Sequence, residues 1–411
     1  MPIPHHTQLA TFFEQNLPAY LDLLRRMVAI NSFTANAEGV KKLARLTAEA
    51  FAPLGFEAEF VPSARPDYGV HLALARPAQG TRQIAFISHL DTVYPPEDEE
   101  QNDFHWRVEG DRIYGPGVVD IKGGTVMILM ILEALRTFAP RIFEGIAWRV
   151  LLNASEETME KDFLQVCRRY LDGEVLACLV FEGGIVRQNT FKVIANRKGM
   201  AIFRITVEGK SAHAGSAHPM GANAIVQMAY LIRDIAGFTD YDKDITFNVG
   251  KIQGGTVTNR VPHFAETWVE MRAFDPDVFA AGIEKVKSLA HRSDVSSQDG
   301  YGCKVNVELV HVTDPWERNP GSERLLRLWQ QAAADMGAQL TREIRGGLSD
   351  GNQLWKYFPT LDALGPSGGN AHSSQRSPDG SKDQEYVSIP SFVPKATLNT
   401  LAVIRLSGWK D

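Results

Sequence analysis

Apolar residues recur along the chain at spacings that predict helices alternating with strands. Helical spacing covers residues 9–30 and 38–54 at the start of the chain and residues 123–138 further on. Short apolar runs predict strands over residues 56–60, 71–75, 82–88, 146–152 and 176–181. This alternation predicts an α/β layered domain, in which sites gather beyond the carboxyl ends of strands.

The pattern changes near residue 191. Alternating strand patterns and helical patterns then follow in the order β-α-β-β-α-β, over residues 203–207, 221–236, 245–252, 263–273, 277–291 and 305–309. This is the order of a ferredoxin-like unit. After residue 320 the α/β pattern resumes and ends in a predicted helix over residues 389–406. We expect a ferredoxin-like α+β domain over residues 193–312, inserted into a larger domain formed by residues 1–192 and 313–411.

Polar segments rich in turn residues predict loops at residues 95–103, 292–302 and 373–384. The length of 411 residues suits two domains, and 44% hydrophobic with 22% charged residues is typical of a globular protein. The net charge of -6 predicts no nucleic-acid partner, and the longest apolar stretch is too short to predict a membrane span. Three widely spaced cysteines and the lack of a signal-peptide pattern predict a cytoplasmic protein.

Candidate chemistry begins at the end of the strand predicted over residues 82–88. The motif Ser88-His89-Leu90-Asp91-Thr92 places His89 and Asp91 two residues apart, so both side chains leave an extended chain on one side. A carboxylate beside an imidazole can fix the tautomer of a metal-binding histidine. A core histidine bonded to an aspartate is the simpler alternative. The choice depends on whether further acidic and histidine residues follow other strands.

Further residues of these types do follow the predicted strands or lie in glycine-rich loops: Asp120, Glu156, Glu157, Glu182 and His372. Taken singly, Asp120 could cap the next helix, and the glutamate pair could be a solvated surface feature. Glu182 could belong to a turn, and His372 could be an exposed loop residue. Taken together, carboxylates and imidazoles without thiolate suit zinc, and two metals that share a carboxylate need about this many ligands.

Four motifs extend the picture: Ser-His-Leu-Asp-Thr-Val at residues 88–93, Gly-Pro-Gly-Val-Val-Asp-Ile-Lys-Gly-Gly at 115–124, Ser-Glu-Glu at 155–157 and Ser-Ala-His-Ala-Gly at 211–215. With them, nearly the whole chain resembles the dinuclear zinc peptidases and deacylases. That family includes glutamate carboxypeptidase, aminoacylase, acetylornithine deacetylase and succinyl-diaminopimelate desuccinylase. The resemblance implies a zinc-peptidase-like catalytic domain with a central mixed sheet and an inserted lid domain that pairs into a homodimer. It also implies two zinc ions per subunit, for which cobalt or manganese could substitute.

The resemblance further implies a role for each candidate ligand. Asp120 would bridge the two metals. One metal would also take His89 and Glu182, and the other would take Glu157 and His372.

Other roles follow from the same resemblance. Asp91 would orient His89, and Glu156 would be the general base that passes a proton from the attacking water to the leaving amine. His213 would reach the active site of the partner subunit and stabilise the carbonyl oxygen. The substrate would be contacted by Asn259, Arg272 and Gly347.

We therefore expect a metal-dependent hydrolase that cleaves an amide bond next to a free C-terminal carboxylate, of carboxypeptidase or dipeptidase type. An N-acyl-amino-acid deacylase is the main alternative, so the substrate is a small peptide or an N-acyl amino acid. A more remote alternative is a serine hydrolase, because Gly347-x-Ser349-x-Gly351 fits the G-x-S-x-G pattern and would use Asp362 and His372. A metal-bearing, non-catalytic peptide-binding protein is another, although Glu156 beside all five ligands argues against it.

Overall fold

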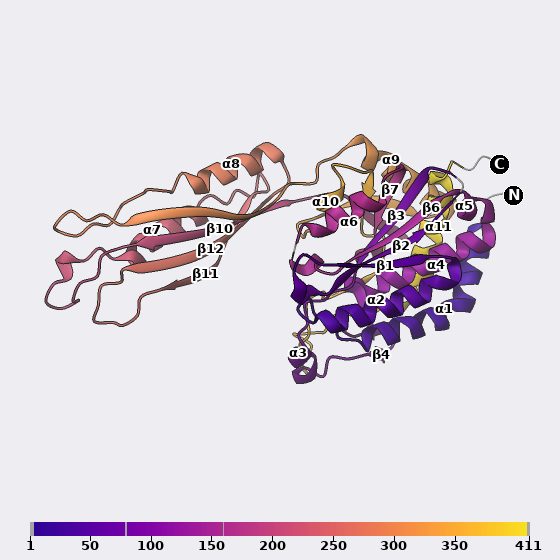
Figure 1. Ribbon diagram of the computed structural model, residues 1–411, viewed down its shortest axis with the longest axis horizontal. Coiled ribbons are helices and arrows are strands. Elements are labelled where there is room, and N and C mark those ends of the chain that lie inside the picture. The colour runs from indigo at the N-terminus through magenta and orange to yellow at the C-terminus, as the bar shows by residue number, and fades with distance from the viewer. Residues whose placement is uncertain (1–3, 79, 159, 409–411) are drawn as a thin grey trace. The chain divides into compact units, whose positions relative to one another are not determined.

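The computed structural model describes residues 4–78, 80–158 and 160–408, and the chain divides into two compact units (Figure 1). The larger unit comprises Met1–Ala195, Arg318–Glu343 and Ser349–Asp411, and the smaller one Asn196–Glu317 and Ile344–Leu348. The smaller unit therefore begins and ends slightly later than residues 193–312 and also takes in residues 344–348. Backbone hydrogen bonds of 3.2 and 3.0 Å join Arg197 to Trp316, so the two connecting segments are paired where the smaller unit begins.

A six-stranded mixed sheet forms the centre of the larger unit, as expected. Its order is β1 (Glu57–Pro62), β2 (Val70–Arg76), β6 (Ala147–Asn153), β3 (Arg82–His89), β7 (Glu174–Val180) and β15 (Thr360–Leu361). The pairs β1/β2 and β2/β6 are antiparallel, whereas β6, β3, β7 and β15 run parallel. The three parallel strands β6, β3 and β7 are therefore adjacent, with their carboxyl ends at one edge of the sheet.

Helices cover both faces of this sheet (Figure 1). One face shares a core with α1 (His6–Val28), α2 (Ala37–Phe51), α4 (Gly123–Phe138), α9 (Pro320–Asp335) and α11 (Phe392–Leu406). The other face packs against α6 (Asp162–Tyr170) and α10 (Gly351–Leu354). Ile84 and Phe86 of β3 belong to the first core and Ala85 and Ile87 to the second. Burial on both faces explains why this strand is a continuous apolar run.

Several local predictions need correction. Residues 95–103 do not form a plain loop, because they contain α3 (Pro96–Gln101), which has proline at its start and acidic residues in its first turn. The helices α5 (Pro140–Gly145) and α6 and the strand β9 (Thr190–Arg197) were not predicted. The helical pattern over residues 38–54 ends as a glycine permits, since a 3₁₀ turn over Ala52–Leu54 stops at Gly55 with a φ of 81°.

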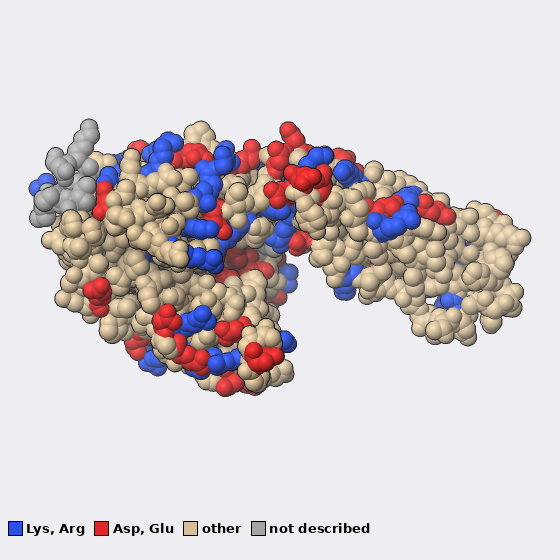
Figure 2. All heavy atoms as spheres, turned by 180° about the vertical axis from the view of Figure 1, so that it is seen from behind, with Lys and Arg blue, Asp and Glu red and all other residues tan. Residues whose placement is uncertain are grey.

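The smaller unit has the predicted β-α-β-β-α-β order. Its elements are β10 (Gly199–Glu208), α7 (Ala224–Ala236), β11 (Thr246–Gly254), β12 (Phe264–Ala273), α8 (Pro276–Lys287) and β13 (Lys304–Thr313). The antiparallel sheet has the order β11-β12-β10-β13, so β11 and β13 are its edge strands. Alternate residues of β10, such as Phe203 and Ile205, join the core of this unit. On the face drawn in Figure 2, much of this unit carries uncharged side chains.

Two small sheets complete the larger unit and its connections. One consists of β14 (Gln339–Arg345), β9 and β8 (Ile185–Arg187). The other consists of β16 (Gly368–Gly369), β17 (Tyr386–Ser388), β5 (Arg112–Tyr114) and β4 (Arg107–Glu109). The second sheet joins the chain around residue 370 to the segment that leads to Asp120. Among the described residues, no helix is both long and apolar enough to cross a membrane.

We predict that Phe86→Ala lowers the free energy of unfolding of the larger unit by about 3–5 kcal/mol. The Phe86 side chain is fully buried, and its ring centroid lies 5.7 Å from that of Trp148 and 5.6 Å from that of Phe181. Phe60→Ala, on the edge strand β1 with 40% of the residue exposed, is the control and should cost about 1 kcal/mol. Urea unfolding followed by circular dichroism measures both. If both variants lost the same free energy of unfolding, Phe86 would not be a core residue of greater weight than the exposed Phe60.

Candidate metal centre

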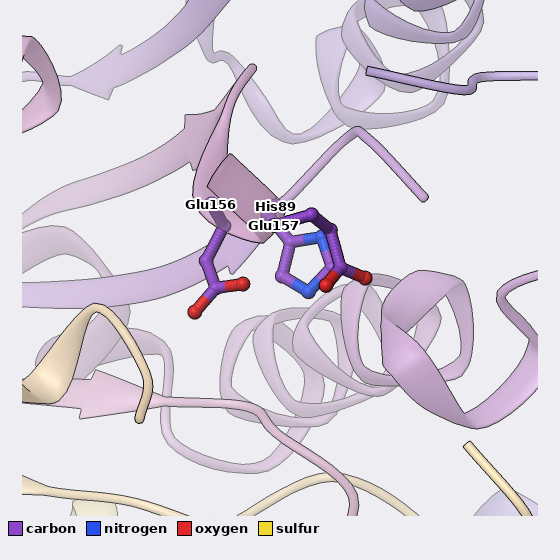
Figure 3. Close-up of side chains that lie close together, drawn as sticks. All are labelled: His89, Glu156 and Glu157. Carbon is purple, nitrogen blue, oxygen red and sulfur yellow. The ribbon is translucent and has the colours of Figure 1, made fainter. Parts of the chain in front are cut away.

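Three adjacent parallel strands deliver candidate ligands to one edge of the main sheet. His89 ends β3, Glu156 and Glu157 form a 3₁₀ turn shortly after β6, and Glu182 follows β7. Neighbouring strands lie about 4.8 Å apart, so side chains that follow them come within reach of one another. Figure 3 shows the side chains of His89, Glu156 and Glu157 extending to the same side. The convergence therefore follows from strand order.

Asp120 lies between the two histidines. Its Oδ1 is 3.0 Å from His89 Nε2, and its Oδ2 is 3.3 Å from His372 Nε2. Glu182 Oε1 lies 3.8 Å from His89 Nε2, and Glu157 Oε2 lies 3.1 Å from His372 Nε2. These contacts form two groups of three donor residues that share Asp120, and within each group the ligand atoms lie within 4.8 Å of one another.

The donor set fits a pair of divalent cations. Imidazole nitrogens and carboxylate oxygens suit zinc, and also cobalt or manganese. The carboxylate side chains are only 19% (Asp120), 7% (Glu157) and 13% (Glu182) exposed. Burial of like charges at this spacing is costly unless positive charge compensates for it. The His372 side chain is 55% exposed, which leaves the centre open to solvent on that side.

The close packing of these titratable groups also shifts their pKa values. Burial raises the pKa of Glu156 well above its usual value, and the neighbouring carboxylates of Glu182 and Glu157 raise it further against the opposing effect of His89. Burial also opposes the ionisation of Asp120, but hydrogen bonds from His372 and His89 outweigh it and lower the pKa of that carboxyl. The bonds to Asp120 and Glu157 raise the pKa of His372 to about 10. A bound cation would compete with these protons.

Asp91 contacts both His89 and the turn that carries Glu156 and Glu157. Its carboxylate accepts hydrogen bonds from the backbone N–H groups of Glu156 (3.1 Å) and Glu157 (3.2 Å), and from Thr34 Oγ1 (2.8 Å). The Nδ1 of His89 lies 2.9 Å from the backbone carbonyl of Asp91 and 3.5 Å from its Oδ1. The carbonyl therefore makes the closer contact with the imidazole, while the carboxylate holds the turn that carries both glutamates.

Glu385 is a buried residue of the site that the sequence patterns did not reveal. Its Oε1 accepts the backbone N–H groups of Val119 (2.8 Å) and Asp120 (3.1 Å), and its Oε2 accepts the Tyr94 hydroxyl (2.7 Å). Its own N–H donates to the carbonyl of Ser373 at 2.8 Å. Burial raises the pKa of Glu385 to about 7. Glu385 thus connects the segments that carry Asp120 and His372, across 265 residues from Asp120.

The serine-hydrolase alternative is wrong. Ser349 is buried and its Oγ donates to Asp362 Oδ2 at 2.7 Å, whereas His372 faces Asp120 and Glu157. A serine nucleophile would need the histidine beside its hydroxyl. The neighbouring Asp350 instead accepts a 2.8 Å bond from Asn153, and burial raises its pKa to about 7.

The residues expected to contact substrate lie in the smaller unit, whereas the five expected ligands lie in the larger one. The Nδ1 of His213 accepts 3.1 Å bonds from the N–H groups of Gly215 and Ser216, which leaves its Nε2 as the proton-bearing nitrogen of an exposed ring. Asn259 lies on the adjacent segment, because its carbonyl accepts the Ala214 N–H at 2.9 Å.

Arg272 lies on β12 of the same unit. Its Nε contacts Glu270 Oε1 at 2.6 Å, and its Nη1 donates to the carbonyl of Gly346 at 2.7 Å. Gly347 follows directly, and its carbonyl accepts a 2.8 Å bond from Arg197. The structure therefore places Arg272 beside the glycine-rich segment that contains Gly347.

Comparison with known proteins gives matches over most of the chain. The M20 model of the peptidase dimerisation domain matches residues 195–295. Carboxypeptidase G2 from Pseudomonas sp. (strain RS-16) is 26% identical over 385 residues, which cover 92% of this chain and 86% of that protein. Succinyl-diaminopimelate desuccinylase from Novosphingobium aromaticivorans is 26% identical over 323 residues, which cover 75% of this chain and 81% of that protein.

The fold has its own match. The crystal structure of a tripeptidase from Staphylococcus aureus superposes with a TM-score of 0.76 at 20% identity, over 95% of this chain and 98% of that one. The dimerisation-domain match and the two long sequence matches identify the chain as a relative of the M20 peptidases and as a metal-dependent hydrolase, and the shared fold agrees with this.

Proposed function

We propose that the protein hydrolyses the amide bond next to a free C-terminal carboxylate, as a carboxypeptidase or dipeptidase, with two zinc ions per subunit. The observation that carries this proposal is the position of Asp120, which directs one carboxylate oxygen toward each histidine. The match to a carboxypeptidase over 92% of the chain supports this type of reaction. The substrate would be a small peptide or a related amide.

The ligand groups suggest how the metals would be held. His89 and Glu182 would bind one ion, Glu157 and His372 the other, and Asp120 both. When bound, the two ions would polarise the scissile carbonyl and lower the pKa of the attacking water.

Glu156 is left for proton transfer, because it belongs to neither of the two groups that contain Asp120, although it lies near His89 and Glu157. Its carboxylate would accept the proton of the attacking water and deliver it to the nitrogen of the leaving amine. Burial raises the pKa of Glu156, so this carboxylate takes up a proton more readily than an exposed glutamate does.

Recognition would come from the smaller unit. The guanidinium of Arg272 can bond two oxygens of a carboxylate, and its contact with Glu270 fixes its orientation. Asn259 and Gly347 would contact the substrate near it. The exposed Nε2–H of His213 can donate to the carbonyl oxygen, on which negative charge develops as the water attacks.

A homodimer would bring His213 to the site of the partner subunit. On α7, Ile225, Val226 and Tyr230 are 38–42% exposed, and Ile252 on the edge strand β11 is 56% exposed. An edge strand beside an apolar helix face is suited to pairing with another copy. The largely uncharged surface in Figure 2 agrees with such pairing. A cytoplasmic location suits the three cysteines, which are buried and not in disulfides.

Deacylation of N-acyl amino acids is a second candidate function. It is favoured by the match to a desuccinylase over 75% of the chain. Both reactions cleave an amide bond, and both could use the same metals, base and carboxylate-binding arginine. The two functions therefore differ only in the group that occupies the other side of the bond.

We predict hydrolysis of dipeptides or N-acyl amino acids, detected as release of the free amino acid across a panel that includes folate-like glutamates. Amidation of the C-terminal carboxylate should lower kcat/KM by about 10-fold to 100-fold, because the bond to Arg272 is lost. A chelator should abolish the activity and added zinc should restore it. Equal rates for amidated and free substrates would show that the carboxylate is not recognised. Turnover that persists in the chelator would show that the reaction does not need the metals.

We predict that Glu156→Gln keeps its metal content but lowers kcat by about 10²-fold to 10⁴-fold, because the proton acceptor is lost. Glu157→Gln is the matched control on the adjacent residue and should lose metal together with activity. Elemental analysis and steady-state rates measure both variants. Loss of metal from Glu156→Gln with retention in Glu157→Gln would show that the two roles are exchanged.

We predict that mixing His213→Ala with Glu156→Ala subunits restores activity. Each variant alone should be nearly inactive, whereas a heterodimer contains one site with an intact Glu156 and an intact His213 from the other subunit. Random exchange should return about a quarter of the wild-type rate. Native mass spectrometry confirms that heterodimers form. If they form without any gain in rate, His213 does not act across a dimer.

A further inference from the structure

A buried histidine–aspartate pair lies outside the ligand set and has no role in the mechanism above. His71, on β2, is completely buried, and Asp162 is the first residue of α6. The Nε2 of His71 lies 2.9 Å from Asp162 Oδ2, and its Nδ1 accepts the backbone N–H of Ala154 at 3.0 Å. One imidazole thus connects α6 to the segment that follows β6.

These contacts determine the tautomer of His71. A backbone N–H can only donate, so Nδ1 must carry the lone pair, and the proton of the neutral ring lies on Nε2. That proton is donated to Asp162, which also accepts the Ser63 hydroxyl (3.0 Å) and the Ala64 N–H (2.6 Å). Burial alone would raise the pKa of Asp162, but the bonds from His71 and Ala64 outweigh it and lower the pKa. Asp162 is therefore a fixed, ionised acceptor.

Ala154 begins the turn that carries both glutamates. Four successive backbone N–H groups in this turn, those of residues 154–157, donate to side chains: to His71, to Asn153 Oδ1 (3.0 Å) and twice to the carboxylate of Asp91. The turn is thus held by three side chains: His71 of β2, Asn153 at the end of β6, and Asp91, which lies two residues after β3. Asp91 lies two residues from the ligand His89, and Asn153 pairs with His89 in the sheet. His71 lies on a different strand, β2, and has neither relation to His89.

We propose that His71, oriented by Asp162, is a positioning residue that fixes the Ala154 amide and thereby sets the place of the Glu156 carboxylate. The inference rests on the proposed role of Glu156 as the base. Glu156 lies only two residues beyond Ala154, so a shift at Ala154 moves the base directly. A misplacement of about 1 Å can lower a rate about 10²-fold. The ligands His89, Asp120, Glu182 and His372 lie on other segments and would keep their positions. The fifth ligand, Glu157, shares the turn and keeps its own bond to the Asp91 carboxylate at 3.2 Å.

Two variants of His71 separate its two hydrogen bonds. The amide oxygen of asparagine takes the place of Nδ1, so His71→Asn keeps an acceptor for Ala154 and loses the contact with Asp162. The amide nitrogen of glutamine takes the place of Nε2, so His71→Gln keeps the contact with Asp162 and leaves the Ala154 N–H without its acceptor. Both variants lose the buried ring, so a purely structural role would affect them alike.

We expect His71→Gln to lower kcat by about 10-fold to 100-fold, with KM and metal content near those of the wild type. His71→Asn should remain within about threefold of wild-type kcat. Steady-state kinetics and elemental analysis measure these values on the full-length, metal-loaded protein. Equal kcat in the two variants, or loss of metal from His71→Gln, would overturn the inference.

If the His71 variants do not fold, substitutions of Asp162 provide the same test. Asp162→Asn keeps an oxygen that can accept the Nε2–H of His71 and should retain kcat, whereas Asp162→Ala frees the ring to turn and should lower kcat at unchanged metal content. Equal kcat in these two variants would also overturn the inference. Failure of the proposed function would give a different result. Full activity in Glu156→Gln would show that Glu156 is not the general base, independently of the His71 variants.

Discussion

The interaction on which the centre depends is the contact of one carboxylate with two imidazoles. Asp120 directs Oδ1 to His89 and Oδ2 to His372, and Glu182 and Glu157 lie beside the same histidines. Largely buried carboxylates at this spacing repel one another, so the arrangement needs positive charge from protons or from cations. The same attraction lowers the pKa of Asp120 and raises the pKa of His372.

The protein holds these acidic groups mainly through main-chain amides. The carboxylate of Asp91 accepts the N–H groups of Glu156 and Glu157, and that of Glu385 accepts the N–H groups of Val119 and Asp120. A bond to the backbone fixes the segment while the side chain that it bears stays available for a metal or a proton. Acceptors outside the ligand set therefore control where the ligands lie, and the buried His71 on β2 accepts the Ala154 N–H in the same way.

The two units divide the chemistry between them. The parallel strands β6, β3 and β7 bring His89 and the glutamates to one edge of a rigid sheet, as a metal centre requires. In our proposal the smaller unit supplies recognition, through an exposed donor at His213 and an oriented guanidinium at Arg272. The M20 peptidase dimerisation domain matches residues 195–295 of this smaller unit, and the carboxypeptidase match extends over 92% of the chain.

Local patterns in the sequence were sufficient for much of the fold and for the ligand candidates. Period-2 and period-3.6 spacing depends on neighbouring residues, so β3, α4 and the β-α-β-β-α-β order could be predicted, and motifs pointed to His89 and Asp120. Glu385 and His71 could not be found in this way, because their partners lie 265 and 83 residues away and no local pattern encodes such contacts. No local pattern determines which carboxylates meet which imidazoles; the family resemblance implied the grouping, and only strand order and long-range hydrogen bonds in the tertiary structure bring those segments together.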